Sequence, residues 1–324
     1  HSQILVLILI WAATVVFVGP LLYLVLPASV FFLRSRDQWP DMIFGFLIIL
    51  VWSDMTPEIF PFRVVKTAKY AYMIALALIF FMETARMSPQ AGVFKVFAPF
   101  LVFAFLPIVA SGEPLVSIQK TISYVLLYLV VPNYILYCYR RMGWLFFRRF
   151  VLFIVVMLVS QMAMPYYGPS WWSFIEGRFR GYFGNPNGLA IFSYLTFMFV
   201  TVLFKVKSDL FSMKGKIAIY ALLVYFLVEC GSRTSLTATF MFLLFYRFFA
   251  ASPFLGFVAF LAFGAAVEAV SSNLPVILNA LGLHTYFRVD TIADGSGRYF
   301  AWAFAWGKIN EGGYFLLGGG FGND

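Results

Sequence analysis

Long runs of apolar residues, separated by short polar or basic stretches, dominate the chain. The runs 150–162 and 253–270 contain almost no polar side chains. A helix needs about 20 mostly apolar residues to cross the hydrocarbon layer of a membrane, whereas the strands of a membrane barrel show short stretches of alternating polarity. The pattern therefore predicts an all-α polytopic membrane protein.

About eleven apolar segments have the length that a bilayer requires. The first run, 4–33, is too long for one crossing, and Gly19 and Pro20 interrupt it, which predicts a hairpin of two short helices. The other predicted helices are 42–52, 67–82, 96–110, 121–137, 148–162, 188–204, 217–230, 234–249 and 254–270. We predict that residues 1–324 form a single membrane domain.

Composition agrees with this class and narrows the chemistry. The chain is 62% hydrophobic and only 11% charged, with a mean hydropathy of +0.89, which excludes an ordinary soluble domain. In a soluble protein the net charge of +9 would suggest binding to nucleic acid. In a membrane protein the basic residues in loops set the orientation in the bilayer, so no nucleic-acid partner is expected. His1 and His284 show no metal-ligand spacing, so no metal or other cofactor is expected. Cys138 and Cys230 are predicted on opposite faces, which argues against a disulfide.

Short loops rich in lysine and arginine are retained on the cytoplasmic side of a membrane. The loops 139–150 and 205–216 each carry four basic residues and are predicted to be cytoplasmic. Counting crossings then places three polar segments outside, namely 165–187, 231–235 and the stretch that begins at 271. The turn 53–66 also counts as outside, although it carries Arg63 and Lys66.

The outer loop 165–187 combines aromatic and basic residues. Its tryptophans, Trp171 and Trp172, are typical of the aromatic belt at a membrane interface. Arg178 and Arg180 precede a Gly-Asn-Pro-Asn-Gly turn, and Asn187 can cap the helix that follows, whose N-terminus offers backbone N–H groups to an anion. Arginine beside such a terminus suits phosphate, and contact with anionic lipid headgroups is the alternative.

The other outer segments also carry charge. Arg233 follows a very short link and places a cation at the outer mouth of the bundle, for binding or simply snorkelling to the interface. The polar segment 271–324 holds Ser296-Gly297-Arg298, and its aromatic stretch 300–306 fits an interfacial helix better than a strand. Glu229 and Glu268 are open to three roles: general base, proton carrier or interface residue.

Three fragments together resemble the O-antigen ligase and O-antigen polymerase superfamily of bacterial envelope polysaccharide assembly. They are Arg178-x-x-Gly181 leading into Phe183-Gly184-Asn185-Pro186-Asn187-Gly188-Leu189-Ala190, then Ser232-Arg233, and then Ser296-Gly297-Arg298 with Gly318-Gly319-Gly320-Phe321-Gly322. The resemblance covers roughly the second half of the chain. It implies a metal-independent glycosyltransferase of the GT-C type in the bacterial inner membrane, with its active site facing the periplasm.

The resemblance also implies the substrates and the residues that bind them. The donor would be a glycan on undecaprenyl or another polyprenyl diphosphate, and the acceptor a lipid A core sugar, another lipid-linked repeat or, in some relatives, a protein. Arg178 and Arg233 would stabilise the diphosphate as catalytic residues. The candidate substrate-binding residues are Asn185, Asn187 and Arg298 within the matching fragments, and Arg180 and Arg288 as further candidates that the resemblance does not assign.

One departure concerns the residue that activates the acceptor. Family members carry a histidine in a His-Asn motif after the glycine-rich stretch, and this sequence reaches Asp324 before that point, while His284 lies upstream of Ser296-Gly297-Arg298. The acceptor-activating residue is therefore unassigned. A transporter or flippase of lipid-linked oligosaccharide is the alternative function, and a membrane scaffold without chemistry is a third.

Overall fold

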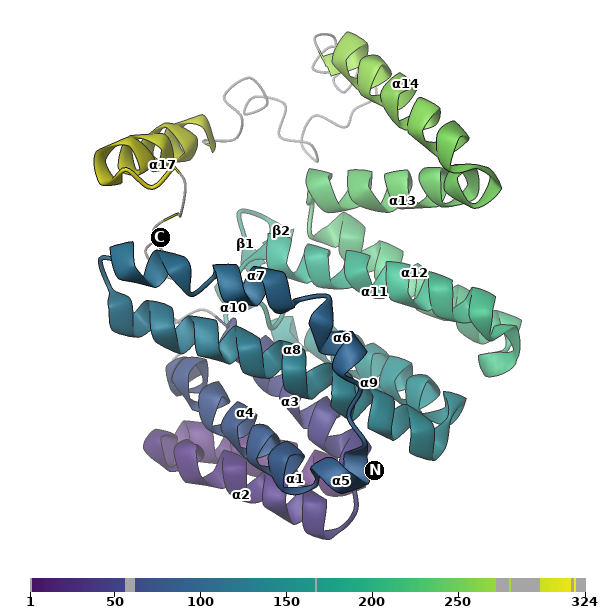
Figure 1. The fold of residues 1–324 in the computed structure, drawn as a ribbon. Helices are drawn as coiled ribbons and strands as arrows, with labels where there is room; N and C mark the ends of the chain where they lie inside the picture. The colour runs from purple at the N-terminus through teal and green to yellow at the C-terminus, as the bar shows by residue number, and fades with distance from the viewer. Residues whose placement is uncertain are drawn as a thin grey trace. The chain divides into compact units, whose positions relative to one another are not determined.

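The computed structural model describes residues 2–55, 62–166, 168–271, 280, 298–315 and 318, and nearly all of them are helical (Figure 1). Within these ranges six segments are long and apolar enough to cross a membrane, namely Gln3–Ser35, Val65–Met82, Pro114–Met142, Trp144–Tyr166, Pro186–Val206 and Arg233–Ala251. The all-α prediction is confirmed, and so are several apolar helices that suit a membrane. The predicted number of about eleven crossings is not confirmed.

The chain divides into two compact units, where the sequence predicted one domain. The first unit comprises His1–Ser160, Tyr182–Gly184 and Trp306–Asp324, and the second comprises Gln161–Gly181 and Asn185–Ala305. The first contains α1 (Ser2–Val18), η1 (Gly19–Leu21), α2 (Leu22–Ser35), α3 (Trp39–Ser53), η2 (Phe62–Val64), α4 (Val65–Met82), α5 (Thr84–Met87), α6 (Ala91–Lys95), α7 (Ala98–Phe103), η3 (Leu106–Ala110), α8 (Pro114–Met142) and most of α9 (Trp144–Met162).

The second unit holds Arg178, Asn187 and Arg233, whereas Phe183-Gly184 and the glycine-rich stretch 318–322 belong to the first. It contains η4 (Met164–Tyr166), α10 (Ser170–Ser173), β1 (Phe174–Ile175), β2 (Arg178–Phe179), α11 (Pro186–Val206), η5 (Ser208–Leu210), α12 (Met213–Glu229), α13 (Arg233–Ala251) and α14 (Pro253–Ser271). The division between the units falls within α17 (Arg298–Gly312). This helix includes the aromatic stretch 300–306, so the predicted helix is confirmed and the strand alternative is wrong.

The N-terminal apolar run folds back on itself, as predicted. The indole Nε1 of Trp11 in α1 donates a hydrogen bond to Ser29 Oγ in α2 at 2.9 Å. In one straight helix two residues so far apart in sequence would be separated by about 27 Å, at 1.5 Å per residue. The chain therefore reverses at η1, where Gly19 and Pro20 interrupt the helix.

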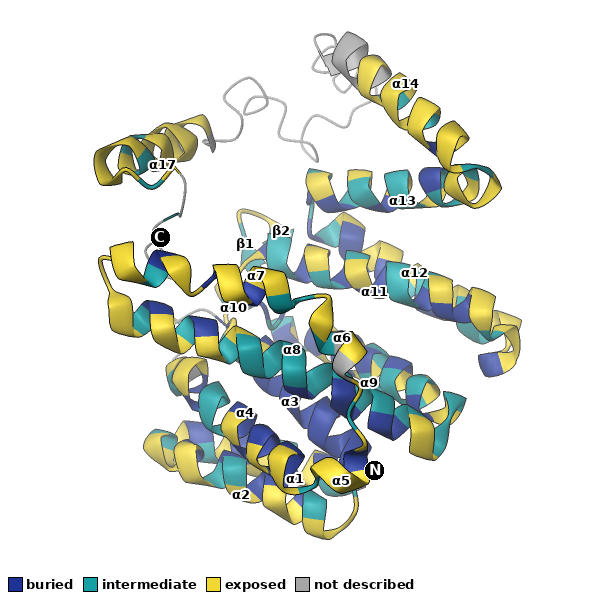
Figure 2. Cartoon of the chain, viewed as in Figure 1, coloured by how far each residue is buried: buried dark blue, intermediate teal, exposed yellow. Residues whose placement is uncertain are grey.

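Helix α3 is the centre of the first unit and is buried along nearly its whole length (Figure 2). Its Phe44 ring stacks on Phe153 of α9 with 4.9 Å between centroids. Gly45 lets two rings approach the α3 backbone, because a Cβ added there would lie 2.5 Å from the Tyr72 hydroxyl and 2.8 Å from the Trp11 ring. Tyr72 also donates to the Met42 carbonyl at 2.9 Å. Aromatic packing against a small residue therefore joins α1, α3, α4 and α9.

The segment predicted at 96–110 is helical from Ala98 to Ala110, but it is divided into two pieces. This stretch consists of α7 and η3, α6 precedes it, and Pro99 and Pro107 each stand at the start of a new piece. Successive contacts run backwards along α8, from Gln90 N to Asn133 Oδ1 (3.0 Å), then Phe97 to Tyr128 (4.2 Å between ring centroids), then Ser111 Oγ to Ser117 Oγ (2.7 Å). The segment 90–111 thus runs antiparallel to α8 and traverses about 24 Å of its length.

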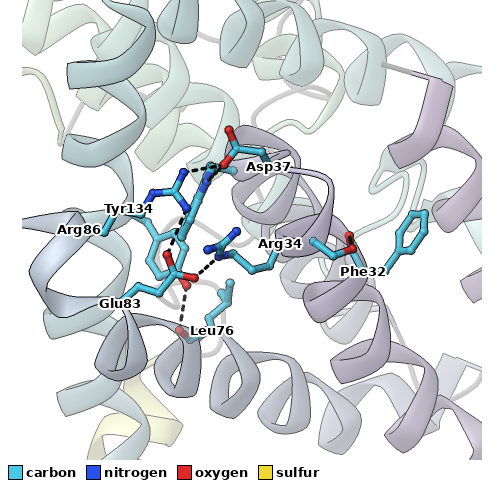
Figure 3. Close-up of polar contacts among 9 residues, drawn as sticks. Phe32, Arg34, Asp37, Leu76, Glu83, Arg86 and Tyr134 are labelled. Carbon is cyan, nitrogen blue, oxygen red and sulfur yellow. Dashed lines mark hydrogen bonds and ion pairs between the residues drawn. The ribbon is translucent and has the colours of Figure 1, made fainter.

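A cluster of charged residues connects several helices at one end of the first unit (Figure 3). Arg34 at the end of α2 pairs with Glu83 after α4, and Arg86 of α5 pairs with Asp37 at 3.0 Å. Arg141 at the end of α8 also pairs with Asp37, at 2.6 Å. We call these five residues the arginine cluster. The arginine cluster lies where α2, α4 and α8 terminate and where α3 begins.

The helices of the second unit alternate in direction. Tyr220 of α12 donates to Thr201 Oγ1 of α11 at 3.1 Å, across the loop that joins these helices. The Lys205 ammonium, near the end of α11, lies 4.6 Å from the Tyr246 ring centroid, near the end of α13. One end of this unit therefore gathers the basic residues Lys205, Lys207, Lys214, Lys216 and Arg247. The start of α11, the end of α12 and the start of α13 lie at the other end.

Candidate functional site

A short β-hairpin positions Arg178, where the sequence predicted only a loop. β1 and β2 pair antiparallel, with Ile175 opposite Arg178. The two turn residues, Glu176 and Gly177, both have positive φ, at 51° and 75°. Positive φ at both positions is the requirement of the tight hairpin turn whose twist matches the strands. The local signal for this turn was Glu176-Gly177, an acidic residue followed by glycine, between Phe174-Ile175 and Arg178-Phe179.

Arg178 joins three segments of the second unit. Its Nε donates to the Cys230 carbonyl at 2.7 Å, and its Nη2 donates to Asn187 Oδ1 at 2.7 Å. Cys230 ends α12, where the carbonyls form the negative end of the helix dipole, so the cation is favoured there. The outer segments 165–187 and 231–235 therefore lie at the same end of the second unit, as predicted.

The cap of α11 differs from the prediction. Asn185, rather than Asn187, is the N-cap, and its side chain accepts from Asn187 N at 2.8 Å. Pro186 has no N–H, and Gly188 N donates to the Asn185 carbonyl at 3.0 Å. The first backbone N–H groups of α11 are thus engaged within the chain, so the attraction for an anion at this end comes from the arginine side chains and the helix dipole.

Arg180 lies in the interior, with only 1% of its surface exposed. Its Nε donates to the Trp172 carbonyl at 3.1 Å and its Nη2 to the Trp171 carbonyl at 2.7 Å. A buried cation with these partners holds the main chain of the loop, while the Trp171 side chain remains 47% exposed. We therefore assign Arg180 to positioning the outer loop, in place of the predicted direct contact with substrate.

Arg233 is the first residue of α13 and is half-buried. The turn before it favours glycine, because Gly231 has a φ of +56°, a conformation that other residues rarely adopt. A cation at a helix N-terminus is opposed by the helix dipole, typically by about 0.3–1 kcal/mol. An anion bound beside Arg233 would offset that repulsion. Arg178 contacts Cys230, so the two arginines stand at adjoining segments.

The remaining candidates fall largely outside the described residues. Arg288 and His284 lie there. Arg298 begins α17 and Glu268 belongs to α14, but their side chains are not among the described ones. Most of the glycine-rich stretch 318–322 lies there too. Glu229, the last residue of α12, is half-buried. Within the part of the chain that is described, no group of three acidic, cysteine or histidine residues could hold a metal ion, and Cys138 and Cys230 are buried free thiols.

An aromatic groove runs along α13 and was not predicted. It has a volume of about 380 Å³, and its lining residues are Tyr194 of α11 and Ala238, Met241, Phe242, Phe245, Tyr246 and Phe249 of α13. Steps of three and four residues along α13 place these side chains on one face of the helix. The same spacing of aromatic residues is visible in the sequence and could have predicted this groove. The groove begins five residues after Arg233, about 7.5 Å along the helix axis.

Comparison with known proteins adds no relative. The chain matches no family model, no curated protein and no solved structure.

Proposed function

We propose that this protein is a glycosyltransferase of the inner membrane that moves a glycan from a polyprenyl-diphosphate-linked donor to a hydroxyl acceptor at the periplasmic face. The acceptor is a lipid A core sugar or another lipid-linked repeat. The observation that carries the proposal is the meeting of the Arg178 and Arg233 segments at one end of the second unit, through the bond from Arg178 to Cys230.

The distribution of charge supports the orientation. In the second unit, the end opposite Arg178 carries five basic residues and one acidic residue, Asp209, in the segment 205–216 and at Arg247. Lysine and arginine in short loops are retained in the cytoplasm, so that end is cytoplasmic and Arg178 faces outward. In the first unit, the arginine cluster and the neighbouring Arg36 and Arg140 identify the cytoplasmic end by the same reasoning.

The chemistry needs fixed positive charge at the leaving group. When an acceptor hydroxyl attacks the anomeric carbon, a new glycosidic bond forms and the bond to the diphosphate oxygen breaks, so negative charge accumulates on the diphosphate. Guanidinium groups held in place stabilise that charge more strongly in the transition state than in the ground state, which raises the rate. The bonds from Arg178 to Cys230 and Asn187 supply this fixed geometry.

The groove on α13 favours one alternative function. An open apolar groove lined by aromatic residues between Ala238 and Phe249 suits the hydrocarbon chain of a lipid. The same groove would also serve a flippase that moves lipid-linked oligosaccharide along α13. The two functions differ in one product, because only the transferase makes a new glycosidic bond.

Purified protein in liposomes, supplied with a lipid-diphosphate donor and a labelled acceptor, tests the proposal. Arg178→Ala and Arg233→Ala are each expected to lower transfer by on the order of 100-fold. Arg247→Ala is the matched control, because it removes an exposed arginine from the other end of the same helix, α13, and should leave turnover unchanged. Unchanged transfer in both test variants would refute the mechanism, and glycan crossing the bilayer without a new bond would indicate the flippase.

A further inference from the structure

A second group of basic residues lies at the end of the first unit that is remote from the arginine cluster. We call Lys66, Lys69 and Lys120 the lysine patch. Lys69 Nζ donates to Ser53 Oγ at the end of α3, at 3.4 Å. Lys66 and Lys120 lie close enough to repel the Lys69 charge, and Asp54 lies close enough to attract it. The end of α3 and the starts of α4 and α8 therefore share this patch.

Helix lengths separate the patch from the arginine cluster. Along α4, Lys69 precedes Glu83 by 14 residues, which corresponds to about 21 Å of helix. Along α8, Lys120 precedes Arg141 by 21 residues, or about 32 Å. If the arginine cluster is cytoplasmic, the lysine patch is at the outer face. The positive-inside rule disfavours basic residues in short loops there, so charges kept at this face call for a functional reason.

Two further observations concern the charges of Lys66 and Lys69. Lys66 stands in the first turn of α4 and Lys69 just after it, where the helix dipole opposes a cation. Among the described residues, Lys66 and Lys69 form no ion pair, and the neighbouring carboxylate of Asp54 accepts instead from Gly184 N at 3.3 Å. An anion bound at the patch would satisfy both the lysines and the dipole of α4.

We propose that the lysine patch binds the phosphate group of a lipid in the outer leaflet. This inference takes its orientation from the proposed function and deepens it, because it gives the acceptor lipid a phosphate-binding site of its own.

Equilibrium binding to the detergent-solubilised full chain tests the site without any transfer reaction. The probes are farnesyl diphosphate, a short-chain phosphatidylglycerol and inorganic pyrophosphate. The test variant is Lys66→Gln/Lys69→Gln, and the control is Lys214→Gln/Lys216→Gln, which removes the same charge from the first turn of α12. The test variant is expected to weaken binding of the two lipid probes by roughly 10- to 30-fold and to reduce its salt dependence, and the control to leave binding unchanged.

Each result bears on the site directly. Rescue of binding by Lys66→Arg/Lys69→Arg would confirm that charge, rather than folding, is responsible. Stronger binding of farnesyl diphosphate than of phosphatidylglycerol would identify a lipid-linked saccharide as the ligand, and the reverse order an ordinary phospholipid. Equal binding in the wild type and the test variant, or equal losses in the test and control variants, would overturn the proposal. Since no transfer is measured, such a failure would leave the roles of Arg178 and Arg233 standing.

Discussion

Replacing Arg178 by alanine should destabilise the outer end of the second unit as well as slow transfer. The side chain makes two short charge-assisted hydrogen bonds, to the Cys230 carbonyl and to Asn187 Oδ1, both at 2.7 Å. Alanine removes both bonds and leaves a carbonyl at the end of α12 without this cation. Asn187→Ala removes only one of the two bonds and keeps the positive charge.

The magnitude follows from the two bonds. A hydrogen bond to a charged group contributes about 1.5–3 kcal/mol in soluble proteins. Side-chain hydrogen bonds within membranes average about 0.6 kcal/mol. Arg178 is half-buried at the end of a helix bundle, so we take about 1 kcal/mol for each bond, between these limits. We expect Arg178→Ala to lower the free energy of unfolding by about 2 kcal/mol and Asn187→Ala by about 1 kcal/mol.

A double-mutant cycle isolates the bond between the two side chains. Wild type, the two single variants and the double variant are unfolded in mixed micelles by an added denaturing detergent, and the coupling energy should be about 1 kcal/mol. Transfer by the same four proteins should fall steeply in both proteins that lack Arg178 and only a few-fold in Asn187→Ala. A coupling energy near zero, or equal losses of transfer in the two single variants, would refute this account of Arg178.

Two further predictions concern the turn before Arg233 and the arginine cluster. Gly231→Ala should lower the free energy of unfolding by at least about 1 kcal/mol because its φ is +56°, whereas Gly112→Ala, with open space at its Cβ, should have little effect in the same assay. The Arg141 hydrogen bond lowers the pKa of Asp37 from 3.8 to about 2, so its contribution to stability is complete above pH 3.8 and is lost as the pH falls towards 2. This difference corresponds to about 2.4 kcal/mol, which we reduce to about 1 kcal/mol because the side chain is 44% exposed. Asp37→Asn should remove this acid dependence from the unfolding curves, and an unchanged curve would contradict the prediction.

Helix positions followed from the sequence because a membrane helix satisfies its own backbone and needs only an apolar surface. The run 188–204 became α11 with nearly the predicted bounds, and the break at Gly19 and Pro20 became the turn between α1 and α2. These features depend on residue types that are close together in the chain. The 96–110 run was predicted as one segment and is divided into α7 and η3, because apolar composition says little about where proline divides a helix.

The roles of the arginines were decided by the tertiary structure. Arg178 and Arg180 are separated by a single residue and have the same chemistry, yet one is half-buried between α11 and α12 and the other is buried beneath the carbonyls of the loop. Their partners include Cys230, which is 52 residues from Arg178. The sequence by itself determined that cations stand in this loop. Which of them is fixed between two helix ends depended on contacts between distant segments, because local residue types do not specify which backbone carbonyl a long side chain will reach.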